Sequence, residues 1–298
     1  MTVDKKYAIG VDVGGSHLCS AVIDLDDRKV CSESVKTDLD SKAGPEVILK
    51  GFETNLNSLM KAFGKSVCNI GFAFPGPFNY QKGISLINGV NKFDNIFGMN
   101  MIESLRPRLD VETPEMLEFR FINDASAFAL GECFCGCASG GGRVMALTLG
   151  TGVGSGFVED YVLDESSERV PDKGEVYCLP FEGTIADNCF STRWVVKRYE
   201  ELAGTRVSGA KDVADRYLSD PAAQQLFHEY GSRLGAFATP LIEKFNAGTL
   251  VLGGNISRAF PLFEKELENN LPDGLVIKTS SLLDSAAMIG AASLFNTI

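Results

Sequence analysis

Short runs of apolar residues separated by polar turns predict most of the strands of this chain. In its first part these runs cover residues 7–13, 18–25, 29–37, 67–74 and 119–123. Residues 45–63 instead carry apolar side chains three or four positions apart, which is the spacing of one face of a helix. The last of the five strands leads directly into a predicted helix at 123–134, which begins with Asn and Asp.

The second part of the chain repeats the arrangement that opens the first, a strand, a glycine-rich turn and a strand. The later pattern predicts strands at 143–149, from 157, at 249–254 and at 275–278, and helices at 191–203, 221–246, from 257 and at 285–296. Such a repeat predicts a duplicated α/β fold, with a ligand cleft between two domains. We place the N-terminal domain at 1–122 plus 285–298 and the C-terminal domain at 123–284, and read residues 138–143, ASGGGR, as either a hinge or a simple loop.

Composition narrows the class to globular proteins. Hydrophobic residues make up 45% of the 298 residues and charged residues 22%, near the globular average. No apolar run reaches the roughly eighteen residues of a membrane span. The opening MTVDKKYAIGVDVGG has only a short apolar run and is not expected to be a secretory signal. We therefore expect a cytoplasmic protein with no membrane partner.

The charge argues against a nucleic acid as partner. The formal net charge is −11, and no segment forms the basic stripe that would face phosphates. An anionic ligand has to be held by local backbone donors and a metal ion, because the overall field repels anions.

The eight cysteines are expected to be reduced thiols. Three of them lie in ECFCGC at 132–137, whose C-x-C-x-C spacing includes no C-x2-C pair. A structural zinc ion needs four Cys or His ligands, and the two histidines, His17 and His228, are far away in sequence. We interpret the cluster as small residues near a helix end.

Two glycine-rich turns are candidate ligand-binding segments, AIGVDVGGS at 8–16 and LTLGTGVGSG at 147–156. Glycines at a hairpin tip let backbone N–H groups approach an anion with no Cβ in the way. Asp12 would repel a phosphate, but it suits Mg²⁺ or a water bound to Mg²⁺. The predicted phosphate-binding residues are Asp12, Gly14, Gly15 and Ser16 in the first turn and Thr148, Gly150, Thr151, Gly152 and Gly154 in the second, with Ser155 as a further hydroxyl donor.

Each turn on its own equally fits a plain hairpin. A Walker P-loop is excluded because no G-x4-G-K-[ST] string occurs. A dinucleotide fingerprint is disfavoured because Ser155 occupies its third glycine position and a strand, not a helix, follows.

Six segments together resemble the repressor–open reading frame–kinase (ROK) sugar kinases, within the superfamily of actin, hexokinase and heat-shock ATPases. In chain order they are IGVDVGGSHLCSAVIDLD, IGFAFPGPFN, FINDASAFALGE, GGGRVMALTLGTGVGSGFV, LVLGGNIS and LLDSAAMIGAASL. The resemblance covers nearly the whole chain. It implies a two-domain actin-like, ribonuclease H-like fold, the use of ATP and Mg²⁺, and a homodimer. The first strand begins near residue 7, so we expect no helix-turn-helix of the kind that the family's repressors carry.

The resemblance also implies roles for individual residues. Asp124 matches the family's catalytic acid, which accepts the proton of the attacking alcohol; the alternative is that Asn123 or Asp124 only caps a helix. The predicted sugar-binding residues are Asn91, Asn123, Asp124, Glu175 and Asp187, of which Asn91 could be a plain turn residue and the last two plain surface acids. Gly253, Gly254 and Asn255 are expected beside the adenine or ribose, and Arg193 is interpreted as structural.

The chain departs from the family pattern where the family binds zinc. GEVYCLPFEGTIADNCF keeps Gly174 and Glu175, but Cys178 stands at the family's histidine position and the C-x-C-G cluster is absent. We therefore expect no structural zinc. Asp187 takes the place of the family's closing glutamate, four residues before Ser191.

Three functions stay open on the sequence. The leading one is an ATP- and Mg²⁺-dependent hexose kinase, with glucose as the family default and N-acetylmannosamine, N-acetylglucosamine, fructose and allose as alternatives. The second is a non-catalytic sugar-sensing or scaffold protein with the same fold. The third is an ATPase or filament-forming relative of actin that takes no sugar.

Overall fold

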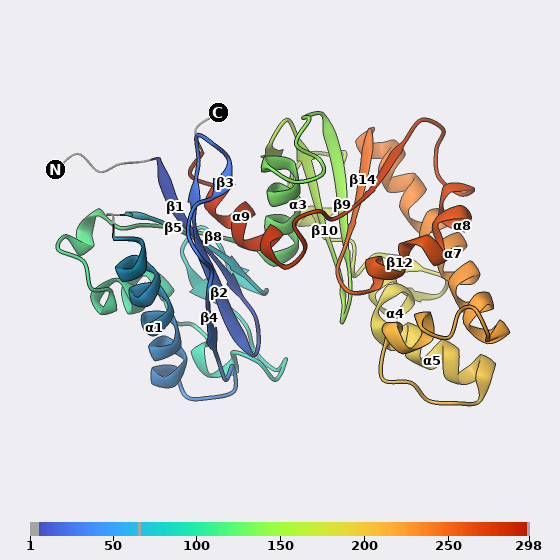
Figure 1. Ribbon diagram of the computed structural model, residues 1–298, viewed down its shortest axis with the longest axis horizontal. Helices are drawn as coiled ribbons and strands as arrows, with labels where there is room; N and C mark the ends of the chain where they lie inside the picture. Colours follow the sequence, from blue (N-terminus) through green and yellow to red (C-terminus); the bar gives the residue numbers. More distant parts are fainter. Residues whose placement is uncertain (1–5, 65–66, 297–298) are drawn as a thin grey trace. The chain divides into compact units, whose positions relative to one another are not determined.

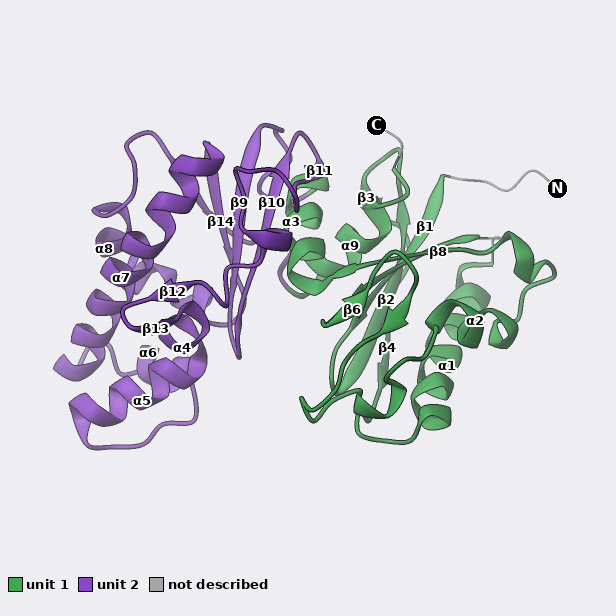
Figure 2. Cartoon of the chain, turned by 180° about the vertical axis from the view of Figure 1, so that it is seen from behind, with its two compact units in different colours: residues 1–135, 284–298 green, residues 136–283 purple. Residues whose placement is uncertain are grey.

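The computed structural model describes residues 6–64 and 67–296, and the chain divides into two compact units (Figure 2). Unit 1 comprises residues 1–135 and 284–298, and unit 2 comprises residues 136–283. The boundary proposed from the sequence, at 122/123, differs because the helix α3 (Asp124–Phe134) groups with unit 1. The signal prediction for the first fifteen residues includes 1–5, which lie outside the described residues.

Unit 1 is built on a mixed sheet in the order β3-β2-β1-β5-β8, with β4 also paired to β2 (Figure 1). Its strands are β1 (Tyr7–Val13), β2 (His17–Asp24), β3 (Lys29–Val30), β4 (Val35–Asp38), β5 (Asn69–Phe74) and β8 (Glu118–Asn123). β1 and β2 are antiparallel, whereas β1, β5 and β8 run parallel. The carboxyl ends of these three parallel strands therefore lie along one edge of the sheet.

Two helices cover opposite faces of this sheet. The α1 helix (Pro45–Phe63) buries Phe52 and Leu56 in a core shared with Ile9 and Val11 of β1. Successive strand residues point to opposite faces, so Gly10 faces the other way, toward α9 (Ala286–Ser293). Asp12 lies on this second face too, because it is two residues beyond Gly10.

The second face is packed closely enough to require glycine. A Cβ on Gly10 would lie 1.9 Å from the Met288 carbonyl oxygen, and one on Gly71 would lie 2.0 Å from that of Ala291. The same closeness joins α3 to α9, where a Cβ on Gly290 would lie 1.8 Å from the Ala127 carbonyl oxygen. This backbone contact is the physical reason why α3 belongs to unit 1.

A segment without long elements links β5 to β8. It contains β6 (Phe78–Asn79), β7 (Ile84–Ser85), η1 (Asp94–Ile96), α2 (Met101–Leu105), η2 (Arg106–Arg108) and η3 (Pro114–Met116). Phe93 is fully buried and anchors the part of this segment that precedes η1.

Unit 2 repeats the sheet plan, in the order β11-β10-β9-β14-β15 (Figure 1). Its strands are β9 (Arg143–Leu149), β10 (Val153–Glu159), β11 (Val162–Leu163), β14 (Thr249–Gly253) and β15 (Val276–Thr279), with a separate hairpin of β12 (Pro180–Phe181) and β13 (Thr184–Ile185). β9 and β10 are antiparallel, and β9, β14 and β15 are parallel. The two sheets thus share an antiparallel hairpin followed by two parallel strands, as the sequence repeat predicted.

Helices cover the unit 2 sheet around an aromatic core. They are η4 (Asp172–Gly174), α4 (Ala186–Phe190), α5 (Thr192–Ala203), α6 (Ala210–Ala214), α7 (Pro221–Phe245), η5 (Ile256–Leu262) and α8 (Glu264–Glu268); η6 (Leu283–Ser285) leads into α9. Phe190, Tyr230 and Phe237 form edge-on and tilted ring pairs within this core. No helix in the described part of the chain is both long and apolar enough to cross a bilayer.

Three predicted elements differ from the structure. The strand predicted at 29–37 is divided into β3 and β4, because the Ser32 hydroxyl takes the hydrogen bond from the Val22 amide (2.9 Å). β10 begins at Val153 and not at 157, so Gly154 lies within the strand, paired with Thr148. The helix predicted from 257 is the 3-10 helix η5, which contains Pro261, followed by α8.

Candidate active site

The first glycine turn joins β1 to β2 and is held by backbone hydrogen bonds. The Gly14 amide donates to the His17 carbonyl (3.0 Å) across the turn, and Leu39 donates to Ser16 (2.9 Å) from the segment after β4. Gly15 and Ser16 are exposed, and no carbonyl of the described residues accepts from their amides. Two backbone donors are therefore available to a ligand at this tip.

Asp12, on the α9 side of the unit 1 sheet, is within electrostatic range of two other carboxylates, Asp124 and Asp284. Asp12 is partly buried near the end of β1, Asp124 begins α3 at the end of β8, and Asp284 precedes α9. Burial, together with the negative charges of Asp124 and Asp284, raises the pKa of Asp12 to about 7. A hydrated cation beside Asp12 would relieve the part of this shift that comes from repulsion, so Asp12 suits the water shell of a metal ion.

Asn123 and Asp124 have different roles at the start of α3. The Asn123 side-chain oxygen accepts from the amides of Ala125 (2.9 Å) and Ser126 (3.4 Å), so Asn123 is the helix cap. Its Nδ2 donates to the Tyr80 hydroxyl (3.3 Å). Asp124 is exposed, and among residues 6–64 and 67–296 its carboxylate is engaged only at Oδ1, by the Ala125 amide (3.0 Å). The capping alternative thus applies to Asn123. One carboxylate oxygen of Asp124 remains able to accept a proton.

The loop before η1 carries Asn91 and Lys92 to the first turn. Asn91 is exposed, has a left-handed backbone (φ 61°) and donates its amide to Asp94 Oδ2 (3.0 Å), so its backbone forms a turn as the alternative interpretation expected. The Phe93 amide donates to the Ser41 carbonyl (2.7 Å), and Ser41 donates to Gly15 (3.3 Å).

Lys92 is a residue that the sequence reasoning missed. A Cβ on Gly15 would lie 3.8 Å from Lys92 Cδ, so the lysine stem lies against the first turn. Within the described ranges 6–64 and 67–296, no carboxylate forms an ion pair with its ammonium group. Phe93 and Asn95 hold the loop to residues 41–43 and so bring this side chain to the turn, and no motif spacing marks it.

The second glycine turn joins β9 to β10 and is held by side chains. The Gly150 amide donates to the Gly152 carbonyl (3.0 Å) within the turn. From outside, Asp187 accepts from the Val153 amide (2.9 Å), and the Thr192 hydroxyl donates to the Gly150 carbonyl (2.9 Å). Thr151 and Gly152 at the tip are exposed.

The end of β14 lies against this second turn. Gly253 pairs in register with Thr148, which is partly buried. Gly254 has φ +81°, and a Cβ there would lie 2.4 Å from the Leu149 carbonyl oxygen, so only glycine fits. The Asn255 amide nitrogen lies 4.0 Å from the place of a Cβ on Gly150. The structure thus brings Gly253, Gly254 and Asn255 together with the second turn.

Comparison with known proteins places these features in a family. The ROK family model matches residues 8–298. This chain belongs to the ROK family. It is 26% identical to a glucokinase of Thermotoga maritima, over 97% of both chains, and 28% identical to an N-acetyl-D-glucosamine kinase of Haemophilus influenzae, over 97% of this chain and 99% of the relative.

A solved ROK structure has the same fold. The ROK glucokinase of Streptomyces griseus, in complex with glucose and AMPPNP, superposes with a TM-score of 0.73 at 21% identity and covers 97% of this chain and 98% of the other. The resemblance inferred from the six motifs is confirmed, and so is the actin-like, ribonuclease H-like α/β fold.

Ser155 and Glu175 are more buried than the sequence suggested. Ser155 is buried, where its hydroxyl donates to the Gly174 carbonyl (2.6 Å) and accepts from the Val176 amide (3.1 Å). The expectation that Ser155 offers a hydroxyl to phosphate is therefore wrong. These bonds hold Glu175 next to β10, and burial raises the pKa of the Glu175 carboxyl.

The region where ROK relatives would be expected to bind zinc carries few ligands here. Cys178 is exposed and Cys189 is buried, and both are free thiols. Within residues 6–64 and 67–296, no three His, Cys, Asp or Glu side chains are grouped to hold a metal ion. The expectation of no structural zinc stays a prediction.

A pocket of about 400 Å³ opens beside the second turn. Its walls are Thr151, Thr192, Arg193, Val196, Lys197, Glu200 and Ser208. The turn and the first helical turns of α5 thus surround a space of the size that a small ligand needs.

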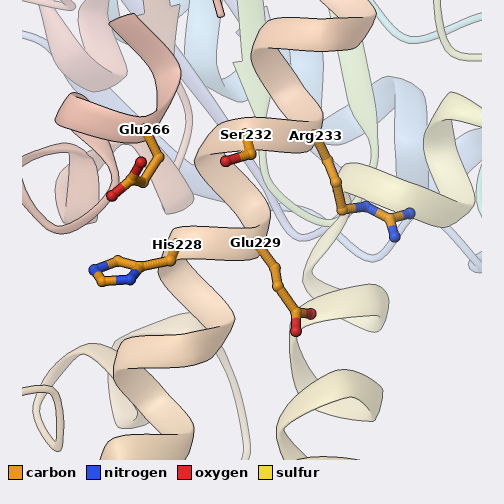
Figure 3. Close-up of a pocket in the computed structure, with 5 residues that line it drawn as sticks. All are labelled: His228, Glu229, Ser232, Arg233 and Glu266. Carbon is orange, nitrogen blue, oxygen red and sulfur yellow. The ribbon is translucent and has the colours of Figure 1, made fainter. Parts of the chain in front are cut away.

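A second pocket, of about 440 Å³, lies on α7 and α8, and no residue of either glycine turn is among its lining residues (Figure 3). It is lined by His228, Glu229, Ser232 and Arg233 of α7, of which the second and the last point to the other side of the helix, and by Glu266 of α8. Glu229 is paired with Arg198 (2.7 Å) and Arg233 with Glu182 (2.8 Å), so these charges serve the packing of α7.

Proposed function

We propose that this protein transfers the γ-phosphoryl group of ATP to a hydroxyl group of a hexose, with Asp124 as the general base. The observation that carries the proposal is the state of Asp124, whose Oδ1 is oriented by the Ala125 amide while the carboxylate stays exposed. It shares the α9 face of the sheet with Asp12, beside a turn with unused amides. The names of the relatives, glucokinase and N-acetyl-D-glucosamine kinase, support the same reaction.

Phosphoryl transfer needs a positioned alcohol and neutralised phosphate charge more than covalent help from the protein. Asp124 accepts the proton of the sugar hydroxyl as the bond to phosphorus forms. Such a base contributes on the order of 10² to 10⁴ in rate. The α3 cap supplied by Asn123 keeps the Asp124 backbone in place.

The phosphates bind at the glycine turns. The amides of Gly15 and Ser16 donate to phosphate oxygens at the first turn, and Gly150 to Gly152 present backbone at the second. Mg²⁺ would offset phosphate charge, and Asp12 would hold it through a water molecule. Thr148, Gly253, Gly254 and Asn255 line the nucleotide side of unit 2, next to the pocket at Thr151.

Lys92 supplies positive charge at the first turn. Its stem lies against Gly15, and its ammonium group has no carboxylate partner in the described part of the chain. In a protein of net charge −11, this lysine offsets part of the repulsion that an incoming phosphate meets.

The sugar is a hexose or an N-acylhexosamine. Asn91, Asn123, Asp124 and Glu175 are its proposed ligands, because carboxylates and amides match pairs of neighbouring hydroxyl groups. The two named relatives act on different sugars at nearly equal identity, so both glucose and N-acetylglucosamine are candidate substrates. Cytoplasmic location and a homodimer are the expected setting.

A single coupled assay tests the proposal. ADP release from ATP and Mg²⁺ is measured with no sugar and with glucose, N-acetylglucosamine, N-acetylmannosamine, fructose and allose in turn. Release that depends on one of the sugars supports the kinase. Equal release without sugar identifies an ATPase, and no release together with sugar binding in calorimetry identifies a sugar-sensing protein.

A further inference from the structure

We infer that Asp187 and Arg193 are positioning residues of the second glycine turn, and that they govern nucleotide binding instead of sugar binding. The inference rests on the proposed function in one respect, the assignment of this turn to the nucleotide. It reassigns Asp187, which the sequence had placed among the sugar ligands.

Both carboxylate oxygens of Asp187 are already engaged. Oδ1 accepts from the Val153 amide (2.9 Å), the first residue of β10 after the turn. Oδ2 forms an ion pair with Arg193 Nη2. The Asp187 side chain is 20% exposed, so little of the carboxylate remains for a sugar hydroxyl.

Arg193 connects Asp187 to the tip of the turn. Its Nη1 donates to the Thr151 carbonyl (3.3 Å), while its Nη2 pairs with Asp187. The guanidinium therefore links the tip to α4, and its planar fork suits such a two-sided contact. Its side chain is 60% exposed and lines the pocket beside the turn.

The residue before Arg193 holds the other side of the turn. The amide and the hydroxyl of Thr192 both donate to the Gly150 carbonyl, at 2.7 and 2.9 Å. The start of α5 and Asp187 of α4 thus grip the turn at Gly150, Thr151 and Val153.

Close approach of the carboxylate depends on glycine at the tip. A Cβ on Gly152 would lie 3.0 Å from Asp187 Oδ1. An acid so near a phosphate turn would repel the ligand if it were unpaired, and the guanidinium cancels that charge. The pair therefore keeps the turn both shaped and electrically neutral.

Loss of the pair removes the bonds to Thr151 and Val153, and leaves the turn with its own bond from Gly150 to Gly152 and the two Thr192 bonds to the Gly150 carbonyl. We expect the free turn to sample conformations that do not bind phosphate, which lowers the apparent affinity for the nucleotide. None of the four proposed sugar ligands, Asn91, Asn123, Asp124 and Glu175, takes part in these contacts, so we expect sugar binding to be unaffected.

The test compares Asp187→Ala, Asp187→Asn, Arg193→Ala and Arg193→Lys in the full chain. MgADP binding is measured by calorimetry, and KM is measured separately for ATP and for the active sugar. We expect each alanine variant to raise the Kd of MgADP and the KM for ATP by about tenfold, the loss expected for one hydrogen bond to a charged group. The KM for the sugar should stay within about twofold, and the double alanine variant should lose less than the sum of both.

Asp187→Asn and Arg193→Lys allow the same measurements if the alanine variants do not fold. The asparagine still accepts from Val153 but loses the ion pair, and the lysine keeps the charge but not the fork, so both should give intermediate losses. Asp215→Asn, which breaks an exposed ion pair with Lys211 in α6, is the matched control and should leave both KM values unchanged.

A raised sugar KM with an unchanged ATP KM overturns the inference, and so do variants that bind MgADP as the unaltered chain does. Absence of nucleotide binding in the unaltered chain also overturns it. If the unaltered chain binds MgADP but phosphorylates no hexose, the proposed function fails while weakened MgADP binding by the variants still supports the inference.

Discussion

The two glycine turns occupy equivalent places in the two sheets yet are stabilised by different means. β1 and β9 each have seven residues and the same pattern of burial along the strand. In both, the sixth residue is partly buried and stands between two buried residues. That sixth residue is Asp12 in the first and Thr148 in the second. The first turn is held by backbone hydrogen bonds and the second by Asp187, Thr192 and Arg193.

The difference shows how one hairpin plan supports two tasks. The first turn, held by backbone bonds, leaves the amides of Gly15 and Ser16 unused and has a carboxylate at its base, which suits a metal-bound phosphate. A turn held by side chains has a shape that depends on residues far away in sequence. Substitutions should therefore affect the two turns in different ways, and the following predictions test that contrast.

The largest effect should come from the base beside the first turn. Asp124→Asn keeps the volume and the cap but cannot take the proton, so kcat should fall on the order of 10² to 10⁴. The measurement is steady-state ADP release with the active sugar, with thermal unfolding as the check on folding. Near-normal turnover would remove Asp124 from its role.

The equivalent strand positions should respond differently to loss of their polar group. Asp12→Asn should raise the Mg²⁺ concentration needed for half-maximal activity by about 10- to 100-fold, the usual cost of losing an outer-shell partner of a metal. Thr148→Val should change the Mg²⁺ requirement little, because no acid is lost there. The measurement is a Mg²⁺ titration of the activity of both variants at saturating ATP. Equal shifts of the half-maximal Mg²⁺ concentration would contradict the proposed difference between the two turns.

Replacing Gly254, where the second turn meets β14, should destabilise the fold more than replacing Gly15 in the first turn. Gly254→Ala places a Cβ 2.4 Å from the Leu149 carbonyl at φ +81°, and we expect it to lower the free energy of unfolding by about 1–3 kcal/mol. Gly15→Ala is the matched change at the first turn, where the nearest atoms would be 3.6 Å and 3.8 Å away. Urea unfolding should show a clear loss for the first variant and little for the second.

The pH dependence of stability should identify the buried acid of the first turn. In the folded chain the pKa of Asp12 is raised to about 7 from an ordinary 3.8, so between these values the folded state binds more protons and stability falls as pH rises. With Mg²⁺ chelated, Asp12→Asn should gain stability relative to the unaltered chain as pH increases over that range. Asp26→Asn, at an exposed position, is the control and should follow the unaltered chain.

The smallest effect should come from the lysine over the first turn. Lys92→Met keeps the stem against Gly15 and removes the charge, so the KM for ATP should rise by a few-fold and up to about tenfold. Because the contribution is electrostatic, the difference should shrink at high salt. A difference that does not respond to salt would point to packing instead of charge.

Local pattern was sufficient for much of the fold. The alternating apolar runs marked β1, β2 and β9, the helical spacing at 45–63 marked α1, and the repeated strand–turn–strand unit marked the duplicated sheet. These features depend on neighbours a few residues apart, so they can be recognised without knowing the rest of the structure. The six motifs were sufficient for the family.

By itself, the amino-acid order determined the family, the two glycine turns and Asp124 at the start of α3. Only the tertiary structure decided that Asn123 is the cap, that Ser155 is buried, that Lys92 lies over Gly15 and that Asp187 holds the second turn. The cap is a local contact, but the other three features depend on residues that are distant in sequence and meet only after packing, as Gly10 and Gly290 do in letting α9 lie close to the sheet and to α3. Side-chain roles of this kind arise from three-dimensional contacts, which no local spacing records.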